Sequence, residues 1–196
     1  MGAEVIKLEI NATEPARQAP PFLHGTVNSE SSLQFLYNNT NKKSITLDIN
    51  RAEGCQAVQQ LLQHCDLLLE SLPPGVLDRL NLPVSRLLRD NPALVITSIS
   101  GFGQSGPHRN FKTSDIVASA LAGAMTVTGF PEDPPVRLVG SQSHVMASTM
   151  AAVSSMIALY HSRETGRGQH VDISIQETML AVTSICGVGK WREDGI

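Results

Sequence analysis

Short apolar runs alternate along the chain with longer segments that have helical periodicity. The apolar runs predict strands at 3–8, 44–49, 66–70, 93–99 and 170–175. Three successive leucines in the third run are typical of a strand that is covered on both faces of a parallel sheet.

Helices are expected between these strands. The pairs Asn50/Glu53 and Ser174/Glu177 have the spacing of a capping box and mark two helix starts. The predicted helices cover 31–38, 50–64, 83–90, 115–127, 145–161 and 176–186. A strand–helix alternation of this kind predicts an α/β domain with a largely parallel sheet and flanking helices.

Two segments read as loops. Residues 9–30 are rich in Pro, Ala, Asn and Ser and predict a long loop, a feature that is usually functional or mobile. Residues 101–107 form a glycine-rich loop after a predicted strand. A break at Pro73-Pro74-Gly75 separates the third strand from the helix that follows it.

Composition limits the class of protein. The 196 residues are 41% hydrophobic and 17% charged, which is enough apolar material for a folded domain. A net charge of -3 without a basic block argues against a dedicated nucleic-acid binder. The weakly polar run 145–160 is too short and too polar to span a bilayer. No secretory signal is visible, and Cys55, Cys65 and Cys186 lack CxxC spacing, so we expect reduced thiols and a cytoplasmic protein.

The glycine-rich loop matches the dinucleotide-binding spacing G-x-G-x-x-G at Gly101, Gly103 and Gly106. Its context does not fit, because Pro107 follows where a helix should begin and no acidic strand end appears about 20 residues later. We therefore interpret it as a loop that crosses the carboxyl ends of the strands, where ligands bind in open α/β sheets.

Two basic positions could bind phosphate. Lys42 and Lys43 lie in a turn before a strand, where they could hold phosphates as point charges or simply face water. Arg79 follows the Pro-Pro-Gly break and could bind a phosphate with two hydrogen bonds, or pair with Asp78 or Asp90 at the surface.

His144 precedes the long helix predicted at 145–161. A histidine there could act as a neutral base or a nucleophile, although a lone histidine is more often a structural hydrogen-bonding group. The sequence contains no Gly-x-Ser-x-Gly elbow, no His-Glu-x-x-His and no metal-type Cys/His cluster, so we expect no metal.

The order of several motifs resembles family III CoA-transferases, the CaiB/BaiF family. The matching stretches are 2–9 (GAEVIKLE), 39–48 (NTNKKSITLD), 69–80 (LESLPPGVLDRL), 91–107 (ending SISGFGQSGP), 128–129 (TG) and 165–174 (TGRGQHVDIS). The resemblance implies the Rossmann-like large domain of that family and an interlocked dimer. It also implies that residues 1–196 are a partial large domain, without the first strand–helix pair and the C-terminal small domain.

The resemblance further implies acyl-CoA chemistry with coenzyme A as substrate. Family members transfer CoA from an acyl-CoA donor to a small carboxylic acid through an aspartate that attacks the thioester. Lys42 and Arg79 match residues that contact the CoA nucleotide. The position of the aspartate is occupied by His144.

This replacement leaves three interpretations open. The chain could be an active transferase in which His144 is the catalytic residue. It could instead be a non-catalytic subunit that works with an aspartate-bearing paralogue. The third possibility is the racemase-type branch, whose histidine would precede Asp115, where this chain has Ser114.

Overall fold

A computed structural model describes residues 2–10, 14–130 and 132–193, with side chains described as far as residue 184. Its contacts divide the chain into two compact units, Met1–Gln60 and Leu61–Ile196. The two units are described separately below.

The first unit is built around two parallel strands. Strand β1 (Val5–Glu9) pairs with β2 (Lys42–Thr46), with Val5 opposite Lys42. Between them the chain forms the 3₁₀ turns η1 (Pro15–Gln18) and η2 (Leu23–Gly25) and then helix α1 (Leu33–Asn38). Helix α2 (Ala52–Leu62) begins in this unit after β2.

Arg17 holds the long connection between β1 and α1. Its guanidinium donates two hydrogen bonds to the carboxylate of Glu9, at 2.7 and 2.9 Å, and one to Glu30 at 2.7 Å. It also lies over the ring of Phe35, with 3.9 Å from Cζ to the ring centroid. Ser44 donates a further hydrogen bond to Glu9 at 2.7 Å. The connection is therefore pinned at Arg17, although most of it lacks regular secondary structure.

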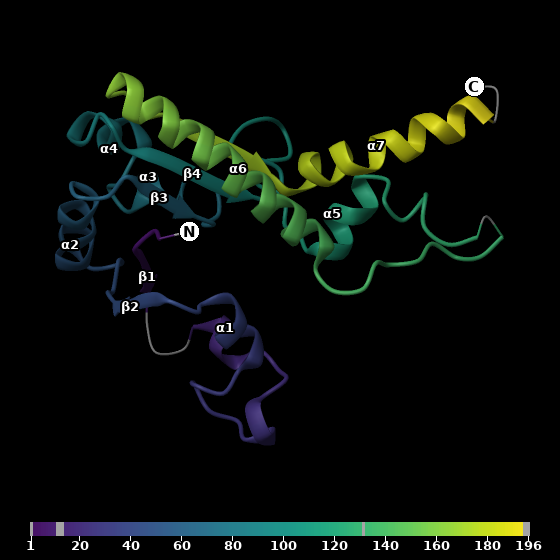
Figure 1. Cartoon of the computed structure of the whole chain (residues 1–196), viewed down its shortest axis with the longest axis horizontal. Coiled ribbons are helices and arrows are strands. Elements are labelled where there is room, and N and C mark those ends of the chain that lie inside the picture. Colours follow the sequence, from purple (N-terminus) through teal and green to yellow (C-terminus); the bar gives the residue numbers. More distant parts are fainter. Residues whose placement is uncertain (1, 11–13, 131, 194–196) are drawn as a thin grey trace. The chain divides into compact units, whose positions relative to one another are not determined.

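The second unit contains a three-stranded parallel sheet in the order β3-β4-β5, drawn in Figure 1. The strands are β3 (Leu67–Glu70), β4 (Val95–Ser100) and β5 (His170–Ser174). The helices are α3 (Val76–Arg79), α4 (Val84–Asp90), α5 (Asp115–Leu121), α6 (Gln142–Thr165) and α7 (Ile175–Glu193).

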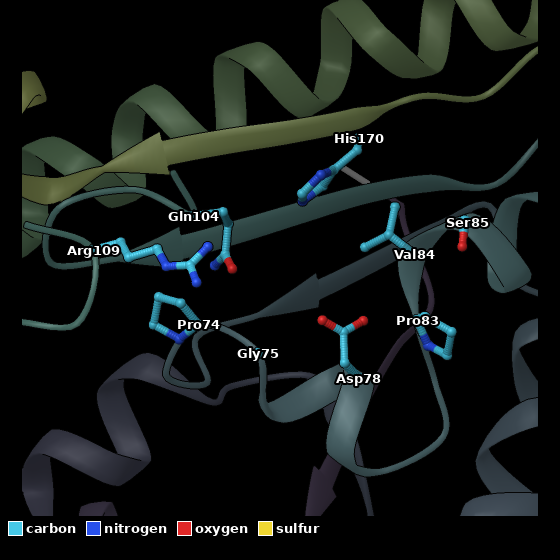
Figure 2. A pocket seen from close by; sticks show the side chains of 9 residues that line it. All are labelled: Pro74, Gly75, Asp78, Pro83, Val84, Ser85, Gln104, Arg109 and His170. Atoms are coloured by element: carbon cyan, nitrogen blue, oxygen red, sulfur yellow. The ribbon is translucent and has the colours of Figure 1, made fainter. Parts of the chain in front are cut away.

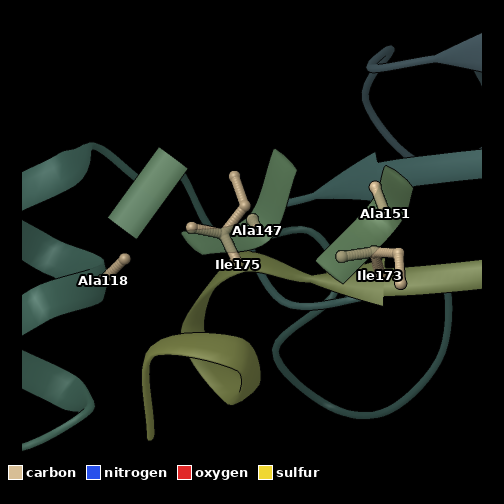
Figure 3. Close-up of a cluster of buried hydrophobic side chains, with 5 residues drawn as sticks. All are labelled: Ala118, Ala147, Ala151, Ile173 and Ile175. Atoms are coloured by element: carbon tan, nitrogen blue, oxygen red, sulfur yellow. The ribbon is translucent and has the colours of Figure 1, made fainter. Parts of the chain in front are cut away.

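Helix α6 packs against one face of this sheet and runs alongside β4 in Figure 1. Thr97 on β4 is hydrogen bonded to Ser155 on α6 across 2.7 Å. Figure 3 shows the buried cluster between α5, α6, β5 and the first residue of α7, made by Ala118, Ala147, Ala151, Ile173 and Ile175. Alanine and serine on the buried side of α6 allow its backbone to approach the strands closely.

The far end of α6 is fixed to the start of β4. Ser162 donates a hydrogen bond to the carbonyl of Ala93 at 2.6 Å, and the backbone N–H of Gly168 donates one to Pro92 at 2.7 Å. A Cβ atom on Gly168 would lie only 1.8 Å from the carbonyl oxygen of Leu94. Only glycine allows the turn before β5 to come this close to the chain before β4.

The α/β architecture with parallel strands and flanking helices is confirmed. Several boundaries differ from those predicted. The helix expected at 115–127 ends at Leu121, because the chain turns at Gly123 with a positive φ of 76°. The strand expected at 44–49 lies at Lys42–Thr46, and α6 begins at Gln142, so that His144 lies inside the helix.

Two local predictions concern capping and the cysteines. Ser174 accepts a hydrogen bond from the N–H of Glu177 at 3.2 Å, which confirms the second capping pattern. Cys55 and Cys65 are free thiols, and burial raises the pKa of Cys65. The side chain of Cys186 lies outside the described residues. No helix in the described part of the chain is long and apolar enough to cross a membrane.

Candidate functional site

A pocket of ≈ 330 Å³ opens on the second unit. Its walls come from the loop before α3, from α3 itself, from the start of α4, from the glycine-rich loop and from the start of β5. Figure 2 shows its lining residues, which are Pro74, Gly75, Asp78, Pro83, Val84, Ser85, Gln104, Arg109 and His170. Two of these walls follow the carboxyl ends of β3 and β4, where parallel α/β sheets bind ligands.

The pocket lies on the polar face of the sheet. Side chains alternate along a strand, so the face opposite α6 carries Ser98, His170 and Asp172. His170 Nε2 lies 2.9 Å from Ser98 Oγ. Asp172 accepts a hydrogen bond from the backbone N–H of Gln104 at 2.8 Å, which holds the glycine-rich loop over this face.

Arg79, one of the residues predicted to bind phosphate, lies beside this pocket. A Cβ atom on Gly75, a lining residue, would be 4.0 Å from Arg79 Nη1. The alternative of a surface pair with Asp90 is not found, because Asp90 pairs with Arg86 at 3.5 Å. Within the described part of the chain, Arg79 forms no ion pair.

Arg109 brings a second guanidinium to the pocket. Figure 2 shows it entering beside Gln104 from the segment that follows the glycine-rich loop, while Asp78 enters from α3. Like Arg79, it has no ion-pair partner in the described ranges. Two arginines next to a cavity whose lining holds one carboxylate, that of Asp78, leave an excess of positive charge. This excess favours an anionic ligand, because a guanidinium binds phosphate or carboxylate with paired hydrogen bonds.

Lys42 belongs to the first unit, as the first residue of β2. Its ammonium is exposed and donates a hydrogen bond to Asn39 Oδ1 at 3.0 Å. The neighbouring Lys43 pairs with Glu4, whose pKa this hydrogen bond lowers. Lys42 therefore remains available to a ligand, but Lys42 and Arg79 fall in different units and are not brought together in one described site.

His144 lies in the first turn of α6, and its side chain is 47% exposed. Its Nδ1 is 3.9 Å from Asp115 Oδ1, the first residue of α5. That oxygen also accepts hydrogen bonds from the backbone N–H and the hydroxyl of Ser143, at 3.0 and 2.8 Å. Arg137 Nε lies 3.8 Å from the other carboxylate oxygen. The imidazole thus sits beside a carboxylate that is held in place by the start of its own helix.

Sequence reasoning missed most of the pocket residues, including His170, Asp78, Gln104 and Arg109. One signal was present. The strand at 170–174 reads His-Val-Asp-Ile-Ser, which places polar side chains on one face and apolar ones on the other. A strand that is covered on both faces is normally apolar on both. The polar side chains therefore indicate a face of the sheet that is available to a ligand.

Parallel strands, and a pocket at the strand ends that is lined by polar side chains and one arginine, define an α/β protein with a candidate ligand site. Comparison with known proteins is more specific. The family model of CoA-transferase family III matches residues 1–189, and the chain belongs to this family.

Curated relatives support the assignment. The chain is 39% identical over 177 residues to succinyl-CoA:(R)-benzylsuccinate CoA-transferase subunit BbsE of Thauera aromatica, covering 90% of this chain and 43% of the relative. It is 35% identical over 189 residues to a formyl-CoA:oxalate CoA-transferase of Streptomyces avermitilis, covering 96% of this chain and 44% of the relative. The chain therefore spans less than half the length of either relative.

A solved structure shares the fold. The CaiB/BaiF family protein from Brucella suis superimposes with a TM-score of 0.90 at 30% sequence identity. The match covers 100% of this chain and 51% of that protein. The curated relatives and the solved structure agree with the family resemblance. That resemblance is the basis for the prediction of Lys42, Arg79 and His144 as site residues.

Proposed function

We propose that this protein binds acyl-CoA and transfers CoA from an acyl-CoA donor to a small carboxylic acid. Membership of the family and the CoA-transferase names of the relatives support the reaction class. The observation that carries the proposal to this chain is the position of Arg79 beside a pocket at the strand ends. Among the described residues, Arg79 has no ion-pair partner.

The CoA nucleotide is the part of the substrate that these residues would recognise. In this proposal Arg79 binds its phosphates through paired hydrogen bonds, and Lys42 remains a predicted nucleotide contact on the family resemblance alone. Arg109 adds a second guanidinium at the same pocket as Arg79. The polar face of the sheet, with Gln104 and His170, offers hydrogen-bond partners to the rest of the ligand.

His144 is the residue proposed at the acyl end of the substrate, because the family resemblance puts it at the position of the nucleophilic aspartate. An imidazole can accept an acyl group or a proton, and either role suits a thioester. In the proposal the acyl group of the donor therefore arrives at the start of α6.

Equilibrium dialysis with CoA tests the binding step. Replacing Arg79 with Ala removes a charge-assisted contact worth about 1.5–3 kcal/mol, so we expect CoA affinity to fall roughly 10- to 100-fold. Arg89→Ala is the matched control, since Arg89 lies in the last turn of α4 and, unlike Arg79, is not among the atoms within 4 Å of a Cβ added at the lining residue Gly75. Equal affinities for the two variants would contradict the assignment of Arg79.

The transfer step is tested by incubation with a panel of acyl-CoA donors and small carboxylic acids. Formation of a new acyl-CoA, measured by chromatography, is the expected result. We also expect His144→Asp to raise the transfer rate, because it restores a carboxylate at the position of the family nucleophile. Absence of exchange with every donor, for protein that binds CoA, would contradict transferase activity.

A second candidate function is favoured by the histidine itself and by the names of two relatives, which are described as transferase subunits. In that case the protein works as a dimer or heteromer in the cytoplasm, and an aspartate-bearing paralogue supplies the nucleophile. Co-purification with such a paralogue would support it, and transfer by this chain alone would contradict it. The racemase-type branch is a weaker alternative, because Ser114 stands where its histidine is expected.

A further inference from the structure

We propose that Asp115 and His144 together activate a water molecule, so that the protein hydrolyses acyl-CoA thioesters to a free acid and CoA. This inference rests on the proposed function, because the thioester must reach the start of α6. It goes beyond that function because it assigns a different acceptor, water, and a new positioning residue, Asp115.

The orientation of the imidazole is the first argument. Asp115 Oδ1 lies 3.9 Å from His144 Nδ1, which is too long for a hydrogen bond, but the nearby negative charge attracts a proton to that nitrogen and so favours the tautomer protonated on Nδ1. The lone pair then resides on Nε2, the nitrogen at the opposite edge of the ring. The half-exposed side chain leaves that edge accessible, and no hydrogen bond to it is found among the described residues. A carboxylate near one ring nitrogen, with the other nitrogen accessible, leaves the imidazole able to act as a general base.

The fixed position of Asp115 is the second argument. Its side chain is only 11% exposed, and Oδ1 accepts both hydrogen bonds from Ser143. Ser141, which precedes α6, makes no side-chain capping bond of its own. Asp115 thus caps the helix from outside and holds the residue next to His144, which restricts where the imidazole can lie.

The same burial prevents Asp115 from acting as the nucleophile. Oδ2 is buried without a hydrogen bond in the described part of the chain, and Oδ1 is occupied by Ser143. A thioester carbonyl cannot reach either oxygen without breaking the start of α6. With no accessible carboxylate at this point, water is the acceptor that the imidazole can serve.

The step is balanced without any further reactant. His144 Nε2 takes a proton from water as the water oxygen attacks the thioester carbonyl, forming a C–O bond. The tetrahedral intermediate then breaks its C–S bond and releases CoA thiolate, which takes the proton back from the imidazolium. The products are one carboxylic acid and one free thiol.

The test measures thiol release from acetyl-CoA without any acceptor acid, together with CoA binding by equilibrium dialysis. We expect steady thiol release that falls about 100-fold or more in His144→Ala. Asp115→Asn keeps an oxygen that can accept from Ser143 but no longer favours the required tautomer, so a decrease of about tenfold or more is expected. His161→Ala is the control, since it removes an exposed histidine from the other end of the same helix.

Three readouts decide between outcomes. Thermal melts of the variants separate loss of fold from loss of chemistry, and a melt of Asp115→Asn like that of the unmodified protein with reduced thiol release supports a positioning role. A solvent deuterium isotope effect on thiol release supports proton transfer from water. An acyl adduct on the peptide that contains residue 144 would overturn the proposal, because it shows nucleophilic attack by His144.

Failure of the inference and failure of the proposed function give different results. CoA binding without thiol release, or thiol release that is unchanged in His144→Ala, overturns water activation and leaves acyl-CoA binding intact. Absence of CoA binding overturns the proposed function, and the hydrolysis that depends on it falls with it.

Discussion

Each of the two units of this protein is stabilised internally, and the stabilising interactions differ between them. In the first, a single arginine connects β1, the long connection and α1 through ion pairs and an aromatic contact. In the second, alanine and serine on α6 pack against a parallel sheet, and charged groups are absent from the buried cluster. A segment with few apolar residues can therefore be ordered by one buried ion pair, whereas the sheet depends on close packing.

We expect the largest loss of stability in the first unit when Arg17 is replaced with Met. Glu9 would remain almost fully buried without its partner, and removing one member of a buried pair costs about 3–5 kcal/mol. Urea unfolding followed by circular dichroism measures the loss. Arg51→Met is the control, because Arg51 is exposed and forms a surface pair with Asp48. A midpoint unchanged in Arg17→Met would show that the connection does not depend on this residue.

Lowering the pH should weaken the same ion pair between Arg17 and Glu9. The Arg17 guanidinium lowers the pKa of Glu9 from 4.5 to about 2. A lowered pKa stabilises the folded state above the unfolded value, and this contribution, about 3 kcal/mol, is lost as pH falls from 4.5 towards 2. Unfolding titrations across this range should show the loss. In Arg17→Met the dependence should be absent or reversed, and an equal dependence in both proteins would exclude Glu9 as its source.

Replacing Ala151 with Leu tests the packing of the second unit. Ala151 is buried between α6 and the sheet, so a larger side chain has no room and the expected loss is about 1–3 kcal/mol. Ala152→Leu is matched in every respect except burial, since Ala152 is exposed on the same helix, and should change stability little. Similar midpoints for the two variants would contradict close packing at this interface.

The smallest effect is expected at the hydrogen bond between Thr97 and Ser155. Ser155→Ala leaves the buried Thr97 hydroxyl without this partner, at a cost of about 1–2 kcal/mol. Adding Thr97→Val removes the second polar group as well, so the double variant should regain much of the loss. If the double variant is instead less stable by the sum of both changes, the bond is not the reason for the two polar residues.

The strands and most helices of the second unit were predictable, because their apolar runs and capping residues are local signals. Ser174 and Glu177 show this, since their spacing alone located the start of α7. The organisation of residues 9–30 was not predictable, because it depends on Arg17 meeting Glu9 and Glu30, which are distant in sequence. Composition indicated only a loop.

The candidate site was predictable only in part. Arg79 could be selected from the resemblance, and the structure places it beside a pocket. The contribution of Arg109 and His170 depends on how the glycine-rich loop folds over the polar face of the sheet, which no local pattern specifies. The proximity of Asp115 to His144 likewise depends on the packing of α5 beside α6, across nearly thirty positions of sequence.

Helix α6 carries His144 in its first turn and is anchored to the chain before β4 near its last, through Ser162. Each residue of an α-helix advances the rotation by about 100°. With Ser162 still anchored, inserting one residue between these two points would swing His144 and the neighbouring Ser143 around the helix axis and away from Asp115. The number of residues in α6 thus sets the direction in which the imidazole points, and the chemistry proposed for His144 depends on that length.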